Sequence, residues 1–86
     1  MSGFEPYRVP AIECAHLFRL GRDVEAALLM VELFGALMPL FDRAPGTVQQ
    51  QWAAVLGQML ACQEGQDWVG LADYLEYELG ELMRVG

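Results

Sequence analysis

The fold is decided by residues 26–41, which read AALLMVELFGALMPLF and contain Glu32 as their only charged residue. A helix this apolar has to be covered by other parts of a protein on nearly all sides. Two structures meet that requirement: a membrane span, or the central helix of a soluble bundle. A span needs about 20 consecutive apolar residues, whereas this run has sixteen and includes Glu32 and Pro39. The sequence therefore favours the soluble bundle, without membrane insertion.

The helix that contains this run is expected to cover residues 23–43. Its polar side is one narrow stripe of Glu25, Glu32 and Arg43, at spacings of 7 and 11 residues. Pro39 removes one backbone hydrogen bond late in the helix, so we expect a kink or an early end just before it. With so little polar surface, this helix is predicted to be covered around some two thirds of its circumference.

A second helix is predicted before it. Pro10 suits the first position of a helix, where its missing N–H costs nothing, and Gly21 ends the apolar repeat that follows. Because Gly21 and Arg22 are then the whole connection, we expect an antiparallel helical hairpin; one continuous helix through Gly21 is the alternative. Residues 1–9, with a glycine and a proline among them, are predicted to be an N-terminal arm.

Two more helices follow, and they complete a single domain at residues 10–86. Thr47 and Gln50 form a plausible capping box for the third helix, and Asp67 is a good N-cap for the fourth. No strand pattern is present in the sequence. The predicted fold class is all-α, a small antiparallel bundle of three to four helices. The side chains expected to be mostly buried are Leu28, Val31, Phe34, Trp52, Met59, Trp68, Leu75 and Leu79.

Length and composition together predict association. A chain of 86 residues buries only about 60–65% of its unfolded surface when it folds alone, and 55% of these residues are hydrophobic. Exposed apolar patches of more than a few hundred Å² usually mark an interface. We therefore expect a homodimer, and a helical protein client is a further candidate. The residues expected in the dimer interface are Leu28, Val31, Phe34, Leu37, Met38 and Phe41.

The net charge of −7 limits the kinds of partner. Twelve acidic residues face five arginines and no lysine, and the arginines are scattered along the chain. Nucleic acid and anionic membrane surfaces are disfavoured, because both need clustered cations. A basic or neutral amphipathic partner fits this charge better, although acidity also serves solubility alone.

A second candidate contact surface lies on the third and fourth helices. No charged residue occurs at positions 47–63, whereas solvent-facing helix surfaces normally carry charges. Exposed tyrosines beside acids on the fourth helix are also typical of docking sites. Whether this surface binds a partner or is a bland exterior is left open by the sequence. The residues concerned are Gln50, Ala54, Gly57, Gln58, Ala61, Tyr74 and Tyr77.

Little in the chain suggests catalysis or a cofactor. Cys14 and Cys62 lie on apolar helix faces and are predicted to be small buried hydrophobes, without the electropositive setting that activates a thiol. No glycine-rich loop joins a strand to a helix. Glu13 and His16 form one E-x-x-H pair, the half-motif of carboxylate-bridged di-iron bundles. Since the chain has a single histidine, only a dimer could build such a metal site, and this is the alternative function.

The N-terminus lacks the features of a secretory signal, so cytoplasmic location is the default expectation. The absence of both lysine and asparagine suggests a GC-rich bacterial gene.

Two short stretches resemble known proteins. Residues 15–27 (AHLFRLGRDVEAA) resemble the inter-helix turn of a tetratricopeptide repeat, with Gly21 at the turn and Ala26 five residues on; this resemblance implies a local helical hairpin. Residues 71–79 (LADYLEYEL) resemble the ending of a set of small bacterial helical proteins associated with flagella and motility. The second resemblance implies a motility-associated accessory and no catalytic residues. Together with the large apolar surface and the uncharged third helix, it predicts a non-catalytic interaction module, an adaptor or small chaperone-like accessory of a motility or secretion system.

Overall fold

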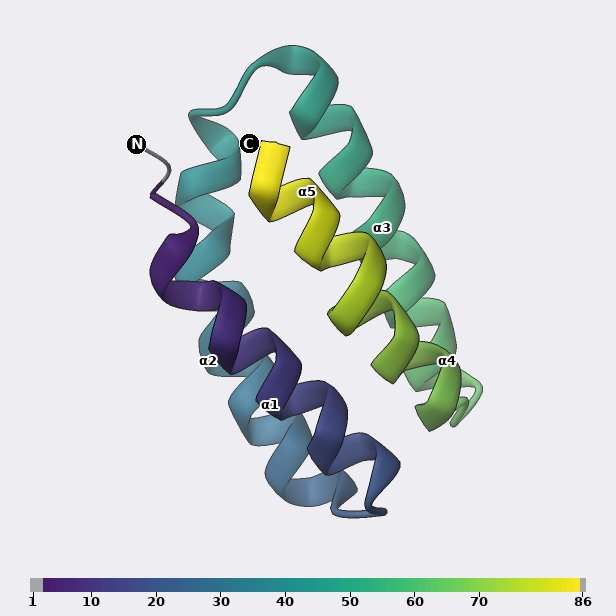
Figure 1. Ribbon diagram of the computed structural model, residues 1–86. Coiled ribbons are helices and arrows are strands. Elements are labelled where there is room, and N and C mark those ends of the chain that lie inside the picture. The colour runs from purple at the N-terminus through teal and green to yellow at the C-terminus, as the bar shows by residue number, and fades with distance from the viewer. Residues whose placement is uncertain (1–2, 86) are drawn as a thin grey trace.

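The computed structural model describes residues 3–85, and every element within them is helical, which confirms the all-α bundle. Segments α4, η2 and α5 follow one another without a break and form one rod, called here the C-terminal rod (Figure 1). With the other three helices it makes an antiparallel bundle. The elements are η1 (Glu5–Tyr7), α1 (Arg8–Arg19), α2 (Asp23–Asp42), α3 (Gly46–Glu64), α4 (Trp68–Asp73), η2 (Tyr74–Glu78) and α5 (Leu79–Val85).

The helices lie in two layers. In Figure 1, α1 and the C-terminal rod face the viewer, and α2 and α3 lie behind them. Helix α1 packs against both α2 and the rod, and α3 packs against the rod, whereas α2 and α3 contact each other less. Helix α2 therefore receives most of its cover from α1, along one side.

The hairpin between α1 and α2 forms as predicted. Gly21 has a φ of +77°, a left-handed conformation that glycine adopts without steric cost, and Asp23 begins α2 directly after the turn. The buried thiol of Cys14 donates a hydrogen bond to the carbonyl of Ala26 at 3.3 Å. Because Ala26 carries only a methyl group, the two helices can approach closely at this point.

Helix α2 continues through Pro39 to Asp42, close to the predicted range of 23–43, so the alternative of an early end before Pro39 is wrong. Proline inside a helix costs about 3 kcal/mol. On either side of it, Leu37 and Phe41 are fully buried in the core, and burial of each such side chain is worth about 1.5–3 kcal/mol. Packing of the last helical turn therefore outweighs the cost of the proline.

Helix ends agree with the sequence at one of two predicted caps. Asp67 caps α4, where its Oδ1 accepts a hydrogen bond from the Gly70 N–H at 3.0 Å. A Cβ at Gly70 would lie 2.3 Å from Asp67 Oδ2, so a side chain at this position would displace the carboxylate from its present place. The capping box at Thr47 is absent, because Pro45 is the residue that precedes α3. The Gln49 side-chain amide instead donates to the Asp42 carbonyl at 2.7 Å, which ties α3 to the end of α2.

Stacked aromatic rings join the N-terminal segment, α2 and α3. The ring centroids of Phe41 and Trp52 lie 4.4 Å apart, with an interplanar angle of 9°. Phe4 packs on the other side of Phe41, with ring centroids 4.5 Å apart. Phe34 meets Trp52 edge-on at 5.8 Å. Phe4 belongs to the predicted arm, yet it is part of the core, and α1 begins at Arg8 rather than at Pro10. Met1, Ser2 and Gly86 lie outside the described residues.

Half of the eight predicted core residues are buried, two are half-buried, and two residues of α2 are exposed. Trp52, Met59, Leu75 and Leu79 are buried, and Phe34 and Trp68 are half-buried. Leu28 and Val31 are 66% and 67% exposed, so the prediction is wrong for them. Residues two positions apart in a helix point in nearly opposite directions. Since Met30 and Leu33 face the core, Leu28 and Val31 face outward.

Two leucines of the same helix provide a matched test of this arrangement. We expect Leu37→Ala to lower the free energy of unfolding by about 2–5 kcal/mol, because it opens a cavity in the core. Leu28→Ala, on the exposed face, should change it by no more than about 0.5 kcal/mol in dilute isolated protein. Urea unfolding followed by circular dichroism measures both. Equal losses for the two variants would contradict the assignment of the faces.

Candidate protein-interaction surface

An uncovered apolar stripe runs along the outer face of α2. Its large side chains are Val24, Leu28, Val31 and Met38, which are 73%, 66%, 67% and 47% exposed. Single exposed apolar residues are common on proteins, but a contiguous row on one helix face marks a candidate interface. The row is called here the outer stripe, and it includes Gly35 between Val31 and Met38.

The spacing of the outer stripe suits a partner helix. Positions 24, 28, 31, 35 and 38 alternate in steps of four and three residues, which is the 3.5-residue period that keeps a seam facing another helix along its whole length. A Cβ added at Gly35 would meet no atom within 4 Å. The packing of the chain therefore does not require this glycine, and its missing side chain leaves room for close approach.

A shallow groove extends the stripe towards the C-terminal rod. Its volume is about 340 Å³, and Trp68 of the C-terminal rod lines the side opposite α2. The Trp68 indole stacks on Phe18, with ring centroids 5.5 Å apart and an interplanar angle of 10°. This stacking fixes the indole in place. The residues that line the groove are Asp23, Val24, Ala27, Leu28, Val31 and Trp68.

Carboxylates frame the stripe. Helix α2 carries Asp23, Glu25, Glu32 and Asp42 and no cationic residue. Glu25 and Glu32 are seven residues apart and thus lie along the same edge. Glu25 makes a solvent-exposed ion pair with Arg22 at 3.8 Å, of a kind that contributes little to stability. With Arg22 and Arg43 flanking the helix, four carboxylates outnumber two arginines, so the field beside the stripe is negative on balance.

Only some of the residues predicted for the dimer interface are exposed in the structure. Leu28, Val31 and Met38 belong to the outer stripe, whereas Phe34 is half-buried. Leu37 and Phe41 cannot take part in an interface in this conformation, because their side chains have no exposed area. Hydropathy alone does not separate Leu37 and Phe41 from the other four residues, because all six are large and apolar.

The second predicted contact surface is solvent-exposed on α3. Gln50, Ala54, Gly57, Gln58 and Ala61 are all exposed. Tyr77 on η2 is exposed as well, and Tyr74 is half-buried beside it. The two tyrosines line a separate depression of about 220 Å³ with Asp73 and Glu78. The two groups of residues thus do not share one pocket.

A polar cluster connects α1 to the C-terminal rod. The Arg19 guanidinium donates to Glu76 Oε1 and, at 2.9 Å, to Asp73 Oδ1. His16 Nε2 lies 3.9 Å from the same Glu76 oxygen. Glu76 belongs to η2, a π-helical turn in which the Leu79 N–H bonds to the Tyr74 carbonyl. This cluster cannot be predicted from the sequence, because Arg19 and its partners are more than 50 residues apart in the chain.

The E-x-x-H pair lies on α1, and the metal site predicted from it would need a second copy of the chain. Glu13 is exposed, and His16 faces Glu76. Among residues 3–85, no group of three or more His, Cys, Asp or Glu side chains is arranged to hold a metal ion.

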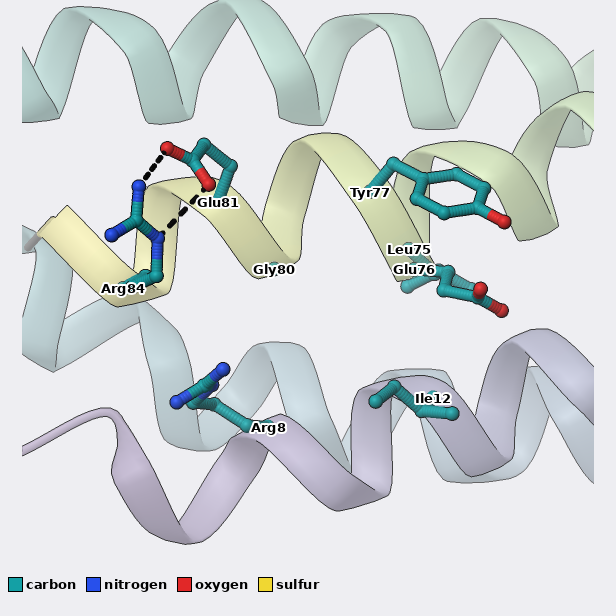
Figure 2. A pocket seen from close by; sticks show the side chains of 8 residues that line it. All are labelled: Arg8, Ile12, Leu75, Glu76, Tyr77, Gly80, Glu81 and Arg84. Carbon is teal, nitrogen blue, oxygen red and sulfur yellow. Dashed lines mark hydrogen bonds and ion pairs between the residues drawn. The ribbon is translucent and has the colours of Figure 1, made fainter.

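A larger pocket of about 390 Å³ lies between α1 and the C-terminal rod (Figure 2). Figure 2 shows Arg8 and Ile12 on the α1 side and the Glu81–Arg84 ion pair on the other. Both arginines already have carboxylate partners: Arg8 lies 3.3 Å from Glu5, and Arg84 Nε lies 3.1 Å from Glu81. The pocket therefore offers no unpaired cation to an anionic ligand.

The two thiols are free and poorly suited to nucleophilic chemistry. Desolvation raises the pKa of Cys14 to about 12. Burial, with a smaller contribution from the Asp67 carboxylate, also raises the pKa of Cys62. Both thiols are therefore protonated at neutral pH, and the thiolate is the reactive form.

Within the described residues, α2 is the one helix whose length and composition would allow it to cross a membrane. The central helix of a bundle can meet the same criteria. Here Leu37 and Phe41 are buried in the core, and Phe41 stacks on Trp52 of α3. In this fold, 28% of the most apolar 18-residue window of α2 is buried.

Comparison with known proteins adds no relative: the chain matches no protein-family model, no curated protein and no solved structure.

The ion pair between Arg19 and Glu76 predicts a dependence of stability on pH. The Arg19 hydrogen bond, helped by one from Tyr77, lowers the pKa of Glu76 below its usual range. A lowered pKa in the folded state stabilises the fold above the unfolded carboxyl pKa of about 4.3. This contribution is lost as the pH falls through the lower folded-state value.

We therefore expect Glu76→Gln to be less stable than the wild type at pH 6 and to lose less stability between pH 6 and pH 3. Urea unfolding at a series of pH values measures this difference. Glu78→Gln is the control, because Glu78 makes none of the ion pairs described above, and it should keep the wild-type pH dependence. If Glu76→Gln kept that dependence too, the pair would not stabilise the fold.

Proposed function

We propose that this protein is a non-catalytic protein–protein interaction module whose contact surface is the outer stripe of α2. The observation that carries the proposal is the continuous row of exposed Val24, Leu28, Val31 and Met38 at the spacing of a helix-pairing seam. The raised pKa of Cys14 and of Cys62 supports a role without a nucleophilic thiol.

The energy available from the stripe indicates the kind of interface. Complete burial of one such side chain is worth about 1.5–3 kcal/mol, so the four, already partly covered, offer roughly 4–8 kcal/mol together. Association costs an estimated 4–15 kcal/mol in lost freedom of motion. The stripe alone supports weak binding, and useful affinity requires further contacts with the Trp68 groove and the acidic edge.

The role we propose within the cell is that of an adaptor or small chaperone-like accessory of a bacterial motility or secretion system. The resemblance of residues 71–79 to motility-associated helical proteins supports this setting. A protein that covers an apolar helix of a client would use such a stripe. A second copy of the chain would cover the stripe as well, and the interaction function holds in either case.

Photo-crosslinking tests the proposal. A photoreactive residue is placed at position 28 in the outer stripe, and in a control chain at Val9, which is 62% exposed on α1. In the native cells, we expect position 28 to form covalent adducts with a polypeptide and position 9 to form none. Absence of polypeptide adducts from position 28, or the same adducts from position 9, would contradict the proposal. Adducts with lipid alone would indicate membrane contact instead.

A further inference from the structure

The charges beside the outer stripe indicate what covers it. Resting on the proposed function, we propose that the occupant is an amphipathic helix of another protein, with lysine or arginine residues along the edge that faces Glu25 and Glu32.

The shape of the surface fits one helix. From Val24 to Met38 the stripe covers fifteen residues, a length of about 21 Å at 1.5 Å per residue. A partner segment of roughly four turns matches that length. Side chains at steps of three and four on such a segment would interdigitate with the stripe, and Gly35, whose Cβ position is open, admits the closest approach.

The groove beside Trp68 provides a place for one larger side chain of the partner. It opens at the Val24 and Leu28 end of the stripe, and its walls are apolar apart from Asp23. Buried aromatic or leucine anchors of this kind are typical of helices that dock in a groove. The groove also fixes the position of the partner along α2. The regular spacing of the stripe alone would allow the partner to bind in several registers.

Charge complementarity favours a basic partner over a second copy. Four carboxylates and no cation lie within α2, and the whole chain has a net charge of −7. Two copies joined through this face would bring two acidic helices together. The cations of each α2 region lie at its ends, as Arg22, which already pairs with Glu25, and Arg43, and neither α2 carries a cation near its middle to pair with Glu32. Lysine or arginine on a partner would pair with these carboxylates and would speed the encounter. An anionic lipid surface would be repelled by the same charges.

Two synthetic helical peptides of 18 residues test the inference. Both carry leucine at steps of three and four; one has lysine and the other glutamate along the edges. Fluorescence anisotropy of the labelled peptides measures their binding to the full chain. We expect the lysine peptide to bind at least about tenfold more tightly than the glutamate peptide at low salt, with the difference reduced at high salt.

Variants separate the local edge from the overall charge. Glu25→Gln with Glu32→Gln should weaken binding of the lysine peptide about fivefold, since each exposed ion pair contributes little. Glu13→Gln with Glu64→Gln alters two exposed acids outside α2 and gives the same net charge, −7 + 2 = −5; it should change binding less than about twofold. Leu28→Glu should abolish binding while the circular dichroism spectrum stays that of the wild type.

The outcomes distinguish the two proposals. If both peptides bind equally, or if both double variants lose equal affinity, the basic-helix inference is overturned, while loss of binding in Leu28→Glu still supports the stripe as a contact surface. If the chain sediments as a dimer that Leu28→Glu dissociates, a second copy is the occupant. If wild-type protein binds anionic vesicles through Leu28, the occupant is lipid. Peptide binding that Leu28→Glu leaves unchanged would overturn both the inference and the proposed function.

Discussion

One constraint governs this structure: α2 is apolar on two opposite faces, and the chain covers only one of them. The inner face places Met30, Leu33 and Leu37 against the other helices. The outer face places Leu28 and Val31 in water. Because successive apolar residues in a helix are rotated by about 100°, a run as continuous as residues 26–41 must supply both faces. A bundle of this size has no further helix with which to cover the second.

The two faces contribute to different properties. Packing of Phe41 between Phe4 and Trp52 joins three segments of the chain and stabilises the fold. The outer stripe contributes nothing to that core, so its apolar character is not explained by the stability of the single chain. Exposed Val and Leu side chains reduce solubility, and the net charge of −7 offsets this effect. These observations are consistent with a surface that is kept apolar for binding.

The sequence predicts the elements better than their faces. The start of α2, the turn at Gly21 and the Asp67 cap follow from local chemistry, and the structure confirms them. Hydropathy cannot separate Leu28 from Leu37, because the same residue type occurs on both faces and burial depends on where α1 and α3 lie. The Arg19 cluster with Asp73 and Glu76 also depends on contacts between distant segments. Phe4 enters the core from a stretch whose glycine and proline suggest an arm.

The central claim is that another polypeptide covers the outer stripe in the cell. Thiol protection measures this directly, with Val31→Cys as the probe and the exposed Glu13→Cys as its control, both in a Cys62→Ala background. The buried Cys14, with its pKa of about 12, reacts too slowly to interfere. The account predicts that maleimide labels both probes rapidly in dilute purified protein and that in native cells Val31→Cys alone is slowed, by at least about tenfold, the protection expected of a bound interface. Equal labelling of Val31→Cys in the cell and in isolation would contradict it.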